Sequence, residues 1–198
     1  APQIRYRYKT GDIQITGAAL WQSQYLSQGP EGKSQKYIKN SCVPEIYAGI
    51  DYKHKGLLIG AGIEMVSLTP RTQATVEDKI YKVSERITSL SYEVHMKYNS
   101  EKWLVAAKSV LGSNLTQVSM LGGYGIKSID QRTGEQEYSP NRNSSSWLNI
   151  VYGKKWKPAV FFGYMKNLGT SDEVTKMYGT GTNVDQLISA SAELTYNV

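Results

Sequence analysis

The chain has 198 residues, of which 40% are apolar and 20% are charged, and its formal net charge is +6. This composition excludes a disordered chain. No apolar run approaches the roughly 20 residues that a membrane-spanning helix needs. The single Cys42 excludes an intramolecular disulfide and a cysteine-rich metal site. The basic residues are scattered along the chain, so no nucleic-acid partner is predicted.

Strand patterns recur in pairs along the chain, and turn-forming residues such as Gly11, Gly56 and Asn99 stand between the two strands of a pair. The expected pairs are Ile4–Lys9 with Ile13–Gln22, Glu45–Tyr52 with Leu57–Val66, Thr88–Tyr98 with Trp103–Leu111, and Trp147–Gly153 with Pro158–Met165. A ninth strand is expected over Leu187–Val198, without a partner in the chain.

Long polar segments separate these pairs. They are Ser23–Val43, Ser67–Ile87, Gly112–Ser146 and Lys166–Gln186. Within them, Ser119–Ile129 is predicted to be an extra strand or a β-rich loop excursion, and Thr170–Gly179 a short helix. Unstructured loops of this length are uncommon in compact soluble domains. A rhythm of short turns and long loops is typical of an outer-membrane barrel.

Apolar and charged residues alternate strictly within the strand patterns. In Thr88–Tyr98, for example, Val94 and Met96 alternate with Glu93, His95 and Lys97. Alternation of this quality indicates strands with one face in an apolar environment. It fits a soluble β-sandwich or lipocalin-like barrel with the apolar rows inside. It also fits a membrane barrel with the apolar rows outside.

Two features favour the membrane barrel. The expected strands approach the roughly 9–11 residues that cross a bilayer at a tilt. Aromatic residues also cluster beside the short turns, where they would form a girdle at the membrane boundary. The girdle residues are Tyr8, Tyr52, Tyr98, Trp103, Tyr152 and Trp156. We therefore predict an all-β fold, an antiparallel up-and-down transmembrane β-barrel with short periplasmic turns and long extracellular loops. Residues 1–198 are expected to form a single barrel domain that is an incomplete part of a larger barrel, with further strands beyond one or both ends.

Two segments, APQIRYRYKTGDIQITGAALWQ and IVYGKKWKPAVFFGYMKNLGT, resemble Gram-negative outer-membrane porins, and most of all the DcaP-like and related porin-type barrels of Bacteroidetes. The resemblance implies a location in the outer membrane and a larger, often trimeric barrel that passes small, frequently anionic solutes. The expected partners are membrane lipid or lipopolysaccharide, small hydrophilic solutes, and a homotrimer or another outer-membrane protein. No cofactor is expected. The chain departs from a complete member in having too few strands and no aromatic strand terminus.

If lipid lies outside, a row of charged side chains faces the lumen. These residues are Arg5, Arg7, Lys9, Glu64, Glu93, His95, Lys97, Lys108 and Glu193. Arg5 and Arg7 lie on one strand face, so both guanidinium groups can grip carboxylates or phosphates in a constriction. An anion-selective ladder is one interpretation. The other is that these charges form ion pairs with neighbouring strands and stabilise a wet interior.

No enzymatic activity and no metal site are predicted. Ser91, Glu93 and His95 share a strand face, but alternate residues of one strand stand about 7 Å apart and do not converge as a catalytic triad does. Two other functions stay open. One is a soluble or surface-exposed β-rich protein that binds carbohydrate or another ligand. The other is an outer-membrane barrel with a non-channel role, such as adhesion.

Overall fold

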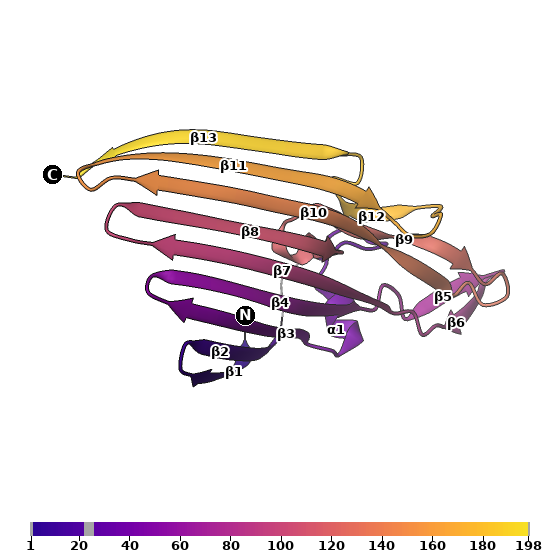
Figure 1. Cartoon of the computed structure of the whole chain (residues 1–198). Coiled ribbons are helices and arrows are strands. Elements are labelled where there is room, and N and C mark those ends of the chain that lie inside the picture. Colours follow the sequence, from indigo (N-terminus) through magenta and orange to yellow (C-terminus); the bar gives the residue numbers. More distant parts are fainter. Residues whose placement is uncertain (1, 22–25, 198) are drawn as a thin grey trace.

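Nine antiparallel strands follow one another across a single open sheet in the computed structural model, which describes residues 2–21 and 26–197 (Figure 1). The strands are β1 (Gln3–Thr10), β2 (Ile13–Leu20), β3 (Glu45–His54), β4 (Leu57–Leu68), β7 (Ile87–Asn99), β8 (Trp103–Ser113), β10 (Gln136–Tyr152), β11 (Trp156–Gly169) and β13 (Gln186–Tyr196). Each pairs with the next in this order. Within the described ranges, β1 and β13 are the two free edges of this nine-strand series. The predicted all-β, antiparallel, up-and-down fold is confirmed, and the sheet is not closed.

Smaller elements gather at one end of the sheet. They are α1 (Lys36–Ser41), the hairpin of β5 (Gln73–Val76) and β6 (Lys79–Lys82), the 3-10 turn η1 (Leu115–Val118), β9 (Gly122–Ile129) and β12 (Met177–Thr180). Figure 1 shows β5, β6, β9 and β12 at the end opposite the short turns between paired strands. The long loops therefore share one end of the sheet, and the short turns share the other.

Two glycines shape the short turns. Gly11 and Gly56 have φ angles of 56° and 82°, in the left-handed region that glycine enters without steric cost. At the second turn, the Asn99 backbone N–H donates to the Gly56 carbonyl at 2.9 Å, which joins this turn to the end of β7.

The hydrophobic core lies at the long-loop end and not between two layers of the sheet. It consists of Tyr37, Ile38, Val66, Leu68, Ile87 and Tyr124, with Tyr138 and Tyr178 packed against it. The Tyr124 side chain is fully buried, and its ring meets that of Tyr138 edge to face with 5.2 Å between centroids. This cluster joins α1 and β9 to the ends of β4 and β7, so the small elements form a packed cap on the sheet.

The structure corrects several boundaries. The strand predicted at Leu187–Val198 does have a partner, because β13 pairs with β11 from Trp156↔Tyr196 to Lys166↔Gln186. The strand predicted to start at Trp147 begins at Gln136. The short helix predicted over Thr170–Gly179 is wrong, because this segment ends in β12, which pairs with β9.

Other expectations are confirmed or extended. The extra strand predicted within Ser119–Ile129 is confirmed as β9. The loop segments Ser23–Val43 and Ser67–Ile87 contain α1 and the β5–β6 hairpin, which the sequence did not predict. Gln22, Ser23–Tyr25 and Val198, at the edges of predicted segments, lie outside the described residues. Across the described ranges, no helix has the length and apolar character needed to cross a membrane.

Candidate functional site

The sheet has one apolar face that the rest of the described chain leaves uncovered. Directly paired residues of neighbouring antiparallel strands point to the same side. One such row runs through Tyr8, Ile15, Ile50, Ala61, Val94, Ser109, Ser146, Tyr164 and Ile188. Within it, Ile50, Val94 and Ile188 are 50%, 57% and 61% exposed. An apolar patch of this extent marks a surface that meets a membrane or another protein.

The aromatic side chains predicted as a girdle lie on this apolar face, beside the short turns. Tyr8, Tyr52, Tyr98, Trp103, Tyr152 and Trp156 are all more than a third exposed. Two contacts connect rings on neighbouring strands. The Trp103 and Tyr152 ring centroids are 4.5 Å apart, and those of Trp156 and Tyr196 are also 4.5 Å apart. Tyr196 therefore extends the series to β13.

The line of rings crosses the strands obliquely. The row that starts at Tyr8 reaches β13 at Ile188, whereas the ring on β13 belongs to Tyr196, which is 196 − 188 = 8 residues further along. Nine strands give eight steps between neighbours. Eight residues at about 3.3 Å and eight steps at about 4.8 Å give an inclination of roughly 35°. Barrel strands tilt by roughly 35–45° from the barrel axis. The rings thus lie at one height if the sheet curves as part of a barrel.

The opposite face carries the charged residues that the sequence singled out. By strand register, all nine lie on it, and we name it the charged face: Arg5, Arg7, Lys9, Glu64, Glu93, His95, Lys97, Lys108 and Glu193. Their distribution is uneven, because β1 at one edge contributes three cations, whereas the carboxylates Glu64 and Glu93 lie nearer the middle.

A network of polar contacts connects the middle strands across the charged face. Glu93 forms an ion pair with Lys108 on β8 and accepts a hydrogen bond from the Tyr47 hydroxyl on β3 at 2.9 Å. His95 Nε2 lies 3.0 Å from Asp51 Oδ1 on β3, and His95 Nδ1 lies 3.8 Å from Glu93 Oε1. The network therefore spans β3 to β8.

The remaining predicted charges have few partners. Among the described residues, Arg7, Lys9 and Lys97 form no ion pair; Arg5 Nη2 donates to the Gln3 side chain at 3.1 Å, and Glu193 accepts from the Thr195 hydroxyl at 2.9 Å. The predicted set thus divides into three parts: a paired central group, a cationic edge on β1, and the remaining charges Glu64, Lys97 and Glu193, which have no ion pair within the described ranges. Ser91 does not meet His95, since its hydroxyl accepts from the Ser113 N–H.

Glycines on the charged face make room for this network. A Cβ atom added to Gly60 would meet the Asp51 carboxylate and the His95 imidazole, and one added to Gly62 would meet the Tyr47 ring. The Asp51–His95 contact crosses β4 because Gly60 leaves its surface flat. On this face, Gly60 and Gly62 therefore serve polar packing.

The substitution Gly60→Ala tests this packing. We expect it to lower the free energy of unfolding by about 1–3 kcal/mol, because the added methyl group overpacks against Asp51 and His95. Gly17→Ala is the matched control, since a Cβ atom at Gly17, also within a strand, meets nothing within 4 Å. Urea unfolding of both variants measures the difference, and equal stabilities would contradict the packing role.

A short loop folds over the charged face between β8 and β9. It contains η1 and is tied down by two bonds: the Asn114 N–H donates to the Asn141 carbonyl at 3.0 Å, and the Asn143 side chain donates to the Leu121 carbonyl. Leu115 is buried. The loop therefore narrows the space next to the charged face in a defined position.

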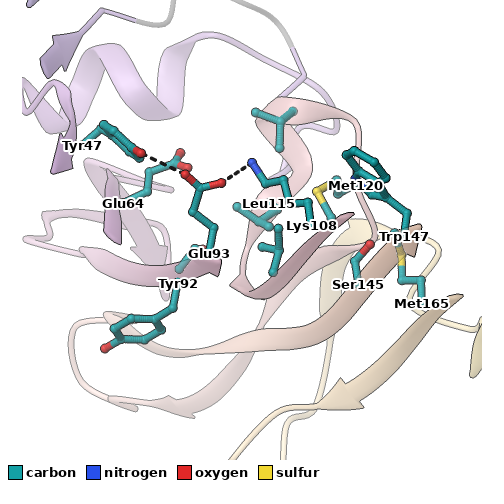
Figure 2. A pocket seen from close by; sticks show the side chains of 13 residues that line it. Tyr47, Glu64, Tyr92, Glu93, Lys108, Leu115, Met120, Ser145, Trp147 and Met165 are labelled. Atoms are coloured by element: carbon teal, nitrogen blue, oxygen red, sulfur yellow. Dashed lines mark hydrogen bonds and ion pairs between the residues drawn. The ribbon is translucent and has the colours of Figure 1, made fainter. Parts of the chain in front are cut away.

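A cavity of about 520 Å³ lies between this loop and the sheet. Figure 2 shows Tyr47, Glu64 and Glu93 on one side of it and Met120, Trp147 and Met165 on the other. A second cavity of about 440 Å³ is lined by Arg5 and Arg7 from β1 and shares Tyr47 and Glu64 with the first. The two cavities thus run side by side from the cationic edge to the apolar loop.

A separate buried ion pair fixes the cap. Glu85, 2% exposed, accepts hydrogen bonds from Arg71, from the Gln136 N–H at 2.8 Å and from the Tyr138 hydroxyl. Arg71 also donates to the Gly134 carbonyl at 2.6 Å. The hydrogen bonds and charge of Glu85 raise the pKa of the Arg71 guanidinium above its ordinary value. This cluster joins the segments that flank the β5–β6 hairpin to the start of β10.

Sequence reasoning missed several residues of the cavity. Tyr47 is the clearest, because it sits on the charged face of β3 and bonds to Glu93, 46 residues further along. Trp147 and Met165 lie on the same face of β10 and β11 but were grouped with their strands without a role. Within the described ranges, no group of three or more His, Cys, Asp and Glu side chains could hold a metal ion.

Comparison with solved structures finds a likeness to the crystal structure of the outer membrane channel DcaP of Acinetobacter baumannii. The TM-score is 0.63 at 14% sequence identity, and the match covers 98% of this chain and 51% of the channel chain. The chain thus spans about half the length of the structure it matches, and the likeness is one of fold. No family model and no curated protein matches the sequence.

Proposed function

We propose that the chain forms part of the wall of a passive outer-membrane channel for small hydrophilic solutes. The observation that carries this proposal is the oblique line of aromatic rings on an uncovered apolar face, because its slope of roughly 35° lies at the lower end of the strand tilt of membrane barrels, roughly 35–45°. The likeness to a solved outer membrane channel supports the same assignment. The apolar face would contact lipid and lipopolysaccharide, or another subunit such as those of a homotrimer.

In this proposal, the charged face lines the water-filled interior. Charged and polar side chains belong in such an interior, since lipid would leave them without hydrogen-bond partners. The loop that carries η1 would narrow the passage. The residues would form one barrel domain, and further strands would pair with the free edges of β1 and β13.

Extraction and conductance test the two parts of the proposal. The purified protein should require detergent to stay monodisperse, and the detergent-folded protein should carry an ion current across a planar bilayer. Monodisperse behaviour in detergent-free buffer would contradict the membrane assignment and favour a soluble binding protein. A folded, inserted protein without current would contradict the channel and favour a barrel with a non-channel role.

The cationic edge should bias the channel towards anions. Arg5 and Arg7 share one cavity and form no ion pair among the described residues. We expect the double substitution Arg5→Glu, Arg7→Glu to lower the anion-to-cation permeability ratio at least about threefold, because it reverses the local potential. The reversal potential in a salt gradient measures this ratio. Arg132→Glu, in an exposed turn, is the matched control, and an equal effect from it would contradict the role of β1.

A further inference from the structure

The cavity beneath the η1 loop has an unusual composition for the wall of an aqueous channel. Apolar side chains line it on two sides: Leu115 and Met120 from the η1 loop, and Trp147 and Met165 from β10 and β11. A hydrophilic solute gains nothing from these side chains, whereas an apolar ring would bury its surface against them at about 25 cal/mol per Å². The volume of about 520 Å³ lies in the range of sites for small organic molecules.

The opposite side of the cavity has an excess of carboxylate. Glu93 is neutralised by Lys108. Glu64 is different, because in the described part of the chain it forms no ion pair with any Lys or Arg. A second carboxylate, that of Glu45, lies next to Glu64 and is 5% exposed. Two carboxylates side by side disfavour each other's charged form, and a nearby cation relieves the repulsion.

Unsatisfied acceptor atoms point to the same conclusion. Among the described residues, Glu64 Oε1 and Glu45 Oε2 are buried and accept no hydrogen bond. Buried polar atoms without partners are rare, because each costs about 1–3 kcal/mol when it loses its hydrogen bond to water. What is missing at this place is therefore a hydrogen-bond donor, and the excess of carboxylate favours a donor with a positive charge.

We infer that this cavity binds a solute that combines an apolar ring with a protonated amine. The ring lies against Trp147, Met120 and Met165, and the ammonium group donates to Glu64. Glu93, Lys108 and Tyr47 form a neutral, hydrogen-bonded wall beside it. The inference deepens the proposed function by naming a solute class. The binding site itself does not depend on the channel function, but a role for it in solute passage rests on the proposed function. It also separates two regions of one wall, a cationic edge at β1 and an amine site near the middle.

Calorimetric titration of the detergent-folded protein tests the site without requiring any current. The probe is 2-phenylethylammonium, with 3-phenylpropionate as the partner of opposite charge and ethylammonium as the partner without a ring. We expect the aryl amine to bind at least about tenfold more tightly than either comparison compound, since each lacks one of the two recognised groups.

Two substitutions assign the binding to this cavity. Glu64→Gln should weaken binding of 2-phenylethylammonium about tenfold and leave 3-phenylpropionate unaffected or slightly favoured. Trp147→Leu should weaken the binding of 2-phenylethylammonium and leave the binding of ethylammonium unchanged. The matched control is Glu101→Gln, a carboxylate with a 78% exposed side chain in the turn between β7 and β8, which should change nothing. Circular dichroism checks that each variant is folded.

The outcomes separate this inference from the proposed function. Equal affinity for the amine and the carboxylate, or an amine affinity unchanged by Glu64→Gln in a folded protein, overturns the inference whether or not the protein conducts. Selective amine binding that depends on Glu64 supports it, and it would stand as a binding site even if no current were observed.

Discussion

Glu85→Gln is expected to lower the free energy of unfolding by about 3 kcal/mol, because it leaves the Arg71 guanidinium without its charge partner in a largely buried place. The Glu85 side chain is fully buried and that of Arg71 is 24% exposed. The substitution also removes a charged acceptor from the Tyr138 hydroxyl and the Gln136 N–H. Urea unfolding in detergent measures the change in global stability, and limited proteolysis of the β5–β6 hairpin measures how far the hairpin itself is loosened.

Two further variants make this prediction specific. Arg71→Met combined with Glu85→Gln should recover part of the lost stability, since the double substitution removes the unpaired charge. Glu31→Gln is the control, because the Glu31–Lys36 ion pair is exposed and such pairs are screened by water and salt. A Glu85→Gln variant as stable as the unsubstituted protein would show that the cluster does not hold the cap.

The second large effect is expected on the apolar face. Ala61 lies on it, in the row of Ile50 and Val94. In a bilayer, Ala61→Arg should cost about 2–4 kcal/mol, the penalty of an arginine near the midplane on the lipid side of a barrel. The measurement is the unfolding free energy of the protein refolded into lipid vesicles.

The matched substitution is Ala159→Arg on the charged face, where Ala159 pairs with Glu193. We expect it to cost little, since an arginine there meets water and a carboxylate. If water covered the apolar face, Ala61→Arg would also cost little. Equal and small effects at the two positions would therefore contradict the membrane assignment.

Most strands of the sheet could be predicted from the sequence, because alternation and tight turns depend only on residues close together in the chain. The strand Trp103–Leu111, for example, was predicted from its alternating pattern and the preceding turn alone. The observed strand β8 is longer by two residues at its end. The sequence QEYSPNRNSSS, in contrast, has the polar residues and the proline of a loop, yet it forms the first part of β10. Its backbone groups are paired there with β9, β8 and β11, and this pairing depends on distant segments.

The candidate site depended even more on pairing over distance. The sequence shows Asp51 and His95 separately, but their contact requires β4 to lie between β3 and β7 with Gly60 at the crossing. The cavity likewise requires the η1 loop to fold onto the charged face, and its apolar residues alone do not indicate this. Alternation within a strand predicted which of its side chains share a face. Which side chains of different strands are neighbours on that face depends on the register of strand pairing.

The order of the sheet has a consequence for its two free edges. β1 and β13 are the first and ninth strands of an antiparallel series, so they run in the same direction. Any segment that bridges them by antiparallel pairing alone must contribute an odd number of strands. Two copies of this sheet, related by rotation about a common barrel axis, would instead join β13 of one to β1 of the other in parallel. By parity, two copies related by such a rotation cannot close a wholly antiparallel barrel, whereas one additional strand, or any odd number of them, between β13 and β1 can.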